Sequence, residues 1–310
     1  MASIAVVIPC YNEAEAIASV VASFKDALPD AMIYVYDNAS TDETAAIAKK
    51  AGAIVRSEPH RGKGNAVRRA FADVDADIYV MADGDGTYDA AAAPRMIDLL
   101  KSGPLDLVVG VRAHRDHTAY RPGHVIGNKA FSFLFRWLFT SDFSDILSGY
   151  RVMSRRFVKS FPLGASGFEI ELEMSAHAAL LRLPTAEVET KYAARGDGSE
   201  SKLRTYSDGA RILRRMFRFL VLHRPGLVYG AFAASSVFAG VVLAVPVVIE
   251  YLNTGLVPRF PTLIVATTLL VCALILFFVG AILDSQAQYF AETKRLSYLR
   301  VAPPSNKKTS

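Results

Sequence analysis

Two long stretches near the C-terminal end contain no charged side chain, and they limit the possible folds more than any other feature. They are residues 227–249 and 260–283. A helix needs about 20 apolar residues to cross the hydrocarbon core of a bilayer, so both stretches are long enough. The short polar segment between them can turn but cannot cross, and the sequence therefore predicts a transmembrane helical hairpin. The alternative is a buried hairpin in a soluble protein, which the rest of the chain is too small to cover.

Basic residues flank this hairpin on both sides. They are Arg211, Arg214, Arg215, Arg218 and Arg224 before it, and Lys294, Arg295, Arg300, Lys307 and Lys308 after it. Basic residues stay on the cytoplasmic side of a membrane. We therefore expect an integral protein of the inner membrane with the N-terminal part and both termini in the cytoplasm.

The arginines before the hairpin recur at helical spacing among apolar residues. This pattern predicts an amphipathic helix over residues 203–225 that lies in the lipid headgroup layer, with a core-packing helix as the alternative. The net charge is +5, but no aromatic-interleaved basic groove or zinc pattern accompanies it. We therefore expect no nucleic-acid partner.

Short apolar runs alternate with helical patterns in the N-terminal part of the chain. We expect strands at 3–9, 31–36, 53–56, 77–81 and 105–109, and helices at 12–28, 42–51, 62–73 and 92–101. This alternation predicts an α/β domain with a mostly parallel sheet that is covered on both faces. The expected division is a catalytic domain at 1–202, the amphipathic helix at 203–225, the hairpin at 226–285 and a basic cytoplasmic tail at 286–310.

Acidic residues follow three of the predicted strands. Glu13 follows the first strand, Asp37 and Asp42 the second, and Asp83 and Asp85 the fourth. Ligands bind beyond the carboxyl ends of parallel strands, and carboxylates that converge there repel one another unless a cation joins them. Oxygen ligands suit Mg²⁺ or Mn²⁺. The Asp-x-Asp motif therefore predicts a site for a divalent metal that would bridge the phosphates of a nucleotide donor. For Asp37 and Asp42 an alternative stays open, in which they only cap the next helix.

A series of motifs resembles a known enzyme family. They are IPCYNE at 8–13, YDNASTDET at 36–44, RGKGNAVRRA at 61–70, ADGDGTYD at 82–89 and SDILSGYRVMSRR at 144–156. In this order they resemble the inverting GT-A glycosyltransferases of family 2 that include dolichol-phosphate mannose synthases and bacterial undecaprenyl-phosphate glucosyltransferases. The resemblance covers about residues 3–225. The tail with two spans resembles that of the bacterial lipid-phosphate glucosyltransferases.

The resemblance implies roles for individual residues. It implies a nucleotide-sugar site of Pro9, Tyr11, Asn12, Glu13, Asp37, Lys63 and Asp83. It implies a metal site of Asp85, Asp83 and Thr87, in which Thr87 stands where the mannose synthases have a glutamine ligand. It implies a lipid-phosphate site of Arg112, Arg121, Arg195, Ser201 and Lys202, and catalytic roles for Asp83, Asp85, Asp145 and Arg151.

Purely structural roles stay open as alternatives for some of these residues. Lys63 could belong to an ordinary helix entry, and Arg151 could pair structurally with Asp145. Glu169 and Glu171 share a face if their segment is a strand, and neither is a candidate for a catalytic base.

The expected reaction is transfer of a hexose from a nucleotide-sugar to a polyprenyl phosphate such as undecaprenyl or dolichyl phosphate. A lipid phosphate is already anionic at pH 7, so its oxygen can attack the anomeric carbon without a general base, which predicts inverting single displacement. A UDP-sugar is favoured as donor and GDP-mannose stays open. The product would serve cell-envelope glycan or glycoprotein assembly. The expected partners are these substrates and membrane lipids, and homo-oligomerisation stays open.

Other functions remain as alternatives. A processive polysaccharide synthase would carry a Gln-x-x-Arg-Trp motif, but Phe133 stands where the glutamine should precede Arg136 and Trp137. The second alternative is a membrane-tethered glycosyltransferase with a non-lipid acceptor. The third is a non-catalytic membrane scaffold.

Overall fold

The computed structural model describes residues 2–112, 135–136, 143–161, 170–192, 217–218 and 220–302. The chain divides into an α/β unit, Met1–Thr205 with Lys294–Ser310, and a helical unit, Tyr206–Thr293. Most of the predicted amphipathic helix at 203–225 lies outside the described residues.

The α/β unit is built on a seven-stranded sheet with the order β3-β2-β1-β4-β6-β5-β7. The strands are β1 (Ile4–Cys10), β2 (Met32–Asp37), β3 (Ile54–Ser57), β4 (Ile78–Met81), β5 (Leu107–Arg112), β6 (Arg151–Ser154) and β7 (Thr185–Thr190). β6 runs antiparallel to both β4 and β5, and the other pairs are parallel. The prediction of a mostly parallel α/β sheet is confirmed. The carboxyl ends of β1, β2, β4 and β5 lie at one edge of the sheet, together with the start of β6.

Helices follow the strands in the predicted alternation. They are α1 (Ile17–Ala27), α2 (Thr44–Lys50), α3 (Lys63–Asp73), α4 (Ala93–Ser102), α6 (Arg155–Ser160) and α7 (Ile170–Leu180), with a 3-10 turn, η1 (Ala90–Ala92), before α4. The first helix begins at Ile17, later than predicted. The segment before it turns instead, because Asn12 takes the left-handed φ of 56° at the end of the strand.

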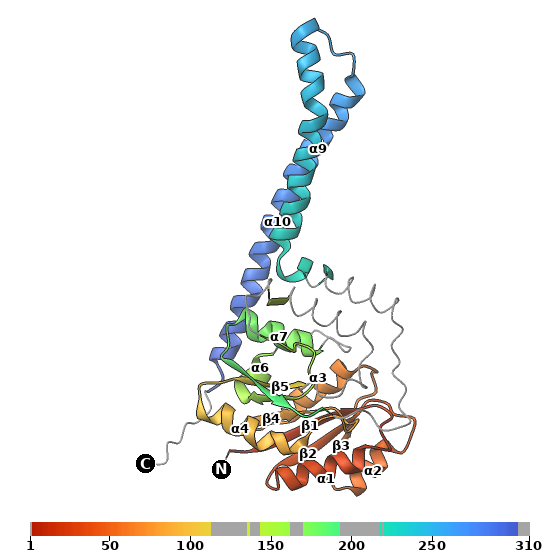
Figure 1. Cartoon of the computed structure of the whole chain (residues 1–310), viewed down its shortest axis with the longest axis vertical. Helices are drawn as coiled ribbons and strands as arrows, with labels where there is room; N and C mark the ends of the chain where they lie inside the picture. The colour runs from red at the N-terminus through yellow and green to blue at the C-terminus, as the bar shows by residue number, and fades with distance from the viewer. Residues whose placement is uncertain are drawn as a thin grey trace. The chain divides into compact units, whose positions relative to one another are not determined.

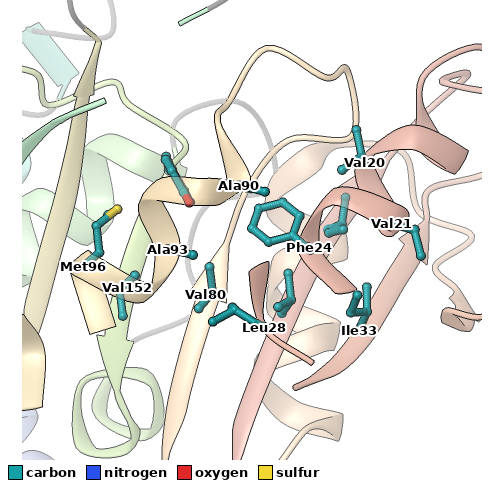
Figure 2. Packing of buried hydrophobic residues seen from close by; sticks show 14 of the residues in the cluster. Val20, Val21, Phe24, Leu28, Ile33, Val80, Ala90, Ala93, Met96 and Val152 are labelled. Atoms are coloured by element: carbon teal, nitrogen blue, oxygen red, sulfur yellow. The ribbon is translucent and has the colours of Figure 1, made fainter. Parts of the chain in front are cut away.

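One face of the sheet packs against α1 and α4. In α1, apolar side chains at helical spacing, among them Val20 and Phe24, point into the core. Figure 2 shows Phe24 in one cluster with Val80 of β4 and with Ala93 and Met96 of α4. This packing fixes the ends of β1 and β4, where the acidic motifs lie.

The other face is covered by α3, α6 and α7 (Figure 1). The ring of Phe71 in α3 meets Tyr79 of β4 edge-on, with 6.1 Å between centroids. His177 of α7 lies edge-on to Phe157 and Phe161, and burial lowers the pKa of its imidazole to about 3. His177 is therefore a neutral core residue, and both faces of the sheet are buried as the apolar strands predicted.

The helical unit contains α9 (Pro225–Thr254) and most of α10 (Phe260–Leu299). Both helices are long and apolar enough to cross a membrane, and they include the two predicted stretches. Their large apolar side chains point outward; Phe238 is 73% exposed and Leu252 is 75% exposed. The core helix of a soluble protein would bury such side chains, so their exposure favours a lipid environment.

Small residues let the two helices approach each other closely. A Cβ atom on Gly240 of α9 would lie 3.1 Å from the Leu270 side chain, and one on Gly280 of α10 would lie 2.8 Å from Tyr229. Gly255, with a left-handed φ of 69°, ends α9 and starts the turn. The two helices therefore pack as a hairpin.

Candidate active site

The loops after β1 and β2 are tied together by side chains that the sequence placed at the strand ends. Thr41 N donates to Asn12 Oδ1 over 2.8 Å, and Asn12 N donates to Ser40 Oγ over 3.0 Å. Glu13 N donates to Thr44 Oγ1 over 2.9 Å. These bonds hold the first two motifs in one rigid cluster at the sheet edge.

Asp42 and Asp37 play different parts in this cluster. Asp42 accepts hydrogen bonds from Thr44 N and Ala14 N; burial alone would raise the pKa of its carboxyl group, but these bonds outweigh it and lower the pKa. Asp42 thus stabilises the loops and the start of α2. Asp37 is only 8% exposed, and its Oδ1 has no hydrogen-bond partner among the described residues. An unsatisfied buried oxygen is costly, which favours a ligand that donates to it.

Asn38 connects this cluster to the loop that precedes α3. Its side-chain nitrogen donates to the carbonyl oxygens of Glu58 and His60, and its Oδ1 accepts from Gly62 N over 2.6 Å. The guanidinium of Arg61 in this loop lies 5.3 Å from the ring centre of Tyr11. The loop and the first helical residue, Lys63, therefore have a fixed place beside the ends of β1 and β2.

Lys63 makes ion pairs with Asp83 Oδ1 and with Glu171 Oε1. Burial lowers the pKa of the Lys63 ammonium, but the two carboxylates outweigh it and raise the pKa above its ordinary value. Lys63 is thus more than a helix-entry residue. Glu171 lies in helix α7 and not in a strand, so the face that a strand would have given it does not apply.

The Asp-x-Asp motif is held by close packing. A Cβ atom on Gly84 would lie 2.4 Å from Cys10 Sγ, so the chain can pass here only as glycine. Asp85 Oδ1 accepts hydrogen bonds from Thr87 Oγ1 over 2.7 Å and from Thr87 N over 3.2 Å. Thr87 therefore orients the Asp85 carboxylate.

The donor set fits a hard divalent cation. Asp83 and Asp85 offer carboxylate oxygens, and no group of three or more His, Cys, Asp or Glu side chains suited to a metal occurs in the part of the chain that is described. Mg²⁺-like ions commonly use one or two carboxylates and complete their shell with water and substrate phosphates. Two carboxylates alone would therefore leave positions on such an ion for water or for phosphate oxygens.

The arginine side of the same edge begins at the end of β5. Arg112 Nε and Nη2 donate to the two oxygens of Asp145 over 2.7 and 2.8 Å. Burial raises the pKa of the Asp145 carboxyl group, but Arg112 outweighs it and the pKa is lowered. The Tyr192 ring centre lies 5.6 Å from the Arg112 guanidinium. Glu187 of β7 accepts hydrogen bonds from Ser144 and thereby supports the loop that carries Asp145.

Arg151 is completely buried at the start of β6. It donates to the carbonyl oxygens of Ser148 and Ile146 and to Ser175 Oγ of α7, each over 2.9 Å. Burial lowers the pKa of its guanidinium to about 10. In the described residues no hydrogen bond or ion pair joins Arg151 to Asp145, so Arg151 instead anchors the loop between them to α7.

The structure thus brings together most of the residues singled out in the sequence. Arg121, Arg195, Ser201 and Lys202 lie outside the described residues, and their roles stay predictions. Sequence reasoning did not give Glu171 a role, although its acidic neighbours in GFEIELEM are a visible signal.

Comparison with known proteins identifies the family. Residues 5–161 match the glycosyl transferase family 2. Glycosyltransferase AglJ of Haloferax volcanii is 36% identical over 255 residues, which cover 80% of this chain and 82% of AglJ. A dolichyl-phosphate hexose transferase of the same organism is 30% identical over 209 residues, covering 67% of this chain and 90% of that protein.

A solved structure shows the same fold. Glucosyl-3-phosphoglycerate synthase from Mycobacterium tuberculosis, in complex with Mn²⁺ and UDP-glucose, aligns with a TM-score of 0.56 and 27% identity over 71% of this chain and 78% of that one. The chain belongs to glycosyltransferase family 2 and is a glycosyltransferase with a GT-A-type domain and two apolar C-terminal helices.

Proposed function

We propose that the chain transfers a hexose from a nucleotide-sugar, a UDP-sugar in preference to GDP-mannose, to a polyprenyl phosphate with inversion at the anomeric carbon. The observation that carries this proposal is the combination, in one chain, of a site with a carboxylate side and an arginine side and of two helices that expose apolar side chains. The likeness to a dolichyl-phosphate hexose transferase supports a lipid acceptor. The likeness to a synthase that binds Mn²⁺ and UDP-glucose supports the donor and a divalent metal.

The carboxylate side suits the donor. Asp37 Oδ1 is a buried acceptor without a protein donor among the described residues, and it would accept from the nucleoside. Pro9, Tyr11, Asn12 and Glu13 would surround that nucleoside. Asp83 and Asp85 would hold Mg²⁺ or Mn²⁺, with Thr87 orienting Asp85, and Lys63 would meet the donor phosphates. A divalent cation bound there would neutralise the charge that develops on the departing nucleoside diphosphate.

The arginine side suits the acceptor. Asp145 holds Arg112 in one orientation through a bidentate pair. A guanidinium has five N–H donors, so one that is oriented in this way can also donate to phosphate oxygens. In the proposed reaction a lipid-phosphate oxygen attacks the anomeric carbon and forms a new carbon–oxygen bond. The bond from that carbon to the nucleoside diphosphate breaks, and its electron pair leaves with the diphosphate oxygen. The anionic phosphate has no proton to lose, so no general base is needed.

We further propose the location and division of the chain. The catalytic domain would comprise residues 1–202, the amphipathic helix 203–225, the hairpin 226–285 and the basic tail 286–310. The catalytic domain and both termini would lie in the cytoplasm, with the hairpin in the inner membrane, because basic residues flank the apolar stretches.

A transfer assay tests the proposal. The purified full chain in detergent is incubated with undecaprenyl phosphate, Mn²⁺ or Mg²⁺, and a panel of labelled UDP- and GDP-sugars, and the label in the organic phase is measured. We expect one donor to label the lipid, and EDTA to abolish that label. Donor binding without lipid label from any donor would reject the lipid acceptor and leave a tethered enzyme with another acceptor or a non-catalytic scaffold.

A further inference from the structure

The Lys63 ammonium is shared by two carboxylates from different parts of the chain. Asp83 follows β4, whereas Glu171 comes from α7, and both contact Lys63 Nζ. The Lys63 and Glu171 side chains are only 11% and 5% exposed. Asp83 and Lys63 have places in the proposed donor site, but Glu171 has none. A second buried carboxylate beside one ammonium is costly unless it serves a purpose.

The backbone closes over this cluster. A Cβ atom on Gly149 would lie 3.0 Å from Lys63 Nζ and 3.0 Å from Asp83 Oδ2. Gly149 N donates to the hydroxyl group of Tyr88 over 2.9 Å, which fixes the covering segment in place. A side chain at this position would press on the ion pairs. The positions of Lys63, Asp83 and Glu171 are therefore set by packing on several sides.

The sharing of Lys63 changes the charge that Asp83 presents. With Asp83 alone, Lys63 would form a neutral ion pair, and a cation approaching Asp83 would meet little net charge. With Glu171 as a second partner, the ammonium is divided between two carboxylates, and less of its charge is left to neutralise Asp83. An ammonium group has three hydrogens to donate, so it can serve both carboxylates at once.

We propose that Glu171 is a positioning residue for the metal and donor site: by sharing Lys63, it leaves the Asp83 carboxylate incompletely paired and able to bind a divalent cation. The inference rests on the proposed function, because it assumes that Asp83 binds the metal–diphosphate complex. Glu171 does not act as a base, since its carboxylate is engaged with Lys63 and an anionic acceptor has no proton to give up.

Binding of Mn²⁺ gives a test that does not depend on turnover. Free Mn²⁺ is measured by its electron paramagnetic resonance signal while the full chain in detergent, saturated with UDP, is titrated. We expect Glu171→Gln to weaken Mn²⁺ binding by about 10-fold, the lower end of the effect of losing a group behind a metal ligand. The matched control is Glu173→Gln on the same helix, whose carboxylate neighbours Lys294, and it should leave Mn²⁺ affinity unchanged.

A double-mutant cycle separates action through Lys63 from a general effect of charge. If Glu171 acts through Lys63, then Glu171→Gln changes Mn²⁺ affinity by less than about twofold in a Lys63→Gln background. An equal loss in both backgrounds would overturn the proposal, as would unchanged affinity in the single variant. Circular dichroism and gel filtration check folding. If Glu171→Gln does not fold, Glu171→Asp, which withdraws the carboxylate by one methylene, is judged by the same criteria.

The outcome is independent of the acceptor. Loss of Mn²⁺ affinity in Glu171→Gln supports the positioning role even if the lipid is not the acceptor. Lipid transfer by the unaltered chain together with unchanged Mn²⁺ affinity in the variant would reject the positioning role and keep the proposed function.

Discussion

The two sides of the site lie at one edge of the sheet but differ in charge and in construction. On the carboxylate side, Asp37 is the last residue of β2, and Asp83 comes two residues after the end of the parallel strand β4. On the arginine side, Arg112 ends β5 and pairs with Asp145, which is 33 residues further along the chain. The antiparallel strand β6 joins the two sides, because it pairs with both β4 and β5.

In the proposed reaction, this difference would let one sheet edge hold two anionic substrates together. The carboxylate side would attract a cation and, through it, the donor diphosphate, whereas the arginine side would attract the acceptor phosphate directly. Changes on the two sides should therefore have separable effects on donor and acceptor kinetics.

The largest effect is expected on the carboxylate side. Asp85→Asn removes one of the two proposed metal carboxylates, and we expect it to reduce the transfer rate by about 1000-fold, the upper end for loss of one electrostatic group. The initial rate of lipid labelling measures this. Asp89→Asn in the same motif is the control, because Asp89 caps η1. Equal rates for both variants would remove Asp85 from the metal site.

A large effect on stability is expected where the two sides join. Arg151→Met leaves the carbonyl oxygen of Ser148 without its side-chain donor and that of Ile146 with only Ser175 Oγ at 3.3 Å, and we expect the free energy of unfolding to fall by about 3 kcal/mol. Denaturant unfolding of the detergent-solubilised protein measures it. If stability stays unchanged while kcat is lost, Arg151 acts on substrate and does not merely anchor the loop.

A smaller effect is expected on the arginine side. Arg112→Gln removes a charge-assisted contact, and we expect the KM for polyprenyl phosphate to rise by about 30-fold, while the KM for the nucleotide-sugar stays unchanged. The control is Arg155→Gln, which breaks an exposed pair with Asp75. A rise in the donor KM instead would contradict the separation of the two sides.

The smallest effect is expected from the group that orients Asp85. Thr87→Val keeps the shape but removes the hydroxyl donor, so Mn²⁺ affinity should fall by about 10-fold. Thr87→Ser should restore most of it because serine keeps the hydroxyl group. Failure of serine to restore affinity would mean that packing of the threonine methyl group matters more than its hydrogen bond.

The carboxylate side was the more predictable from sequence for a physical reason. Its residues follow strands whose apolar runs are clear, and parallel strands bring their carboxyl ends to one edge. The pairing of Arg112 with Asp145 and of Lys63 with Glu171 joins segments that are distant in the chain, and no local pattern encodes such contacts. The structural role of Arg151 could not be predicted either, since a sequence does not show whether an arginine donates to carbonyl oxygens or to substrate.

Prediction of the strands and helices was limited in a similar way. The strands and helices up to β5 were predicted to within a few residues, because their periodicity and length are distinct. β6 and α7 were not assigned, since β6 lies within a polar motif and α7 is buried on nearly every side, with polar and apolar residues mixed around it. A helix without a polar face gives no period by which to recognise it.

Direct attack by an acceptor phosphate is the central claim, and a comparison of acceptors tests it most directly. The purified chain, with one active labelled donor and Mn²⁺, is offered undecaprenyl phosphate or the matching undecaprenol, and the labelled lipid is quantified. Labelling of undecaprenyl phosphate alone would agree with an anionic acceptor that needs no base and is held by Arg112. Equal labelling of undecaprenol would contradict it, because a neutral hydroxyl group needs a base and gains nothing from the arginine side.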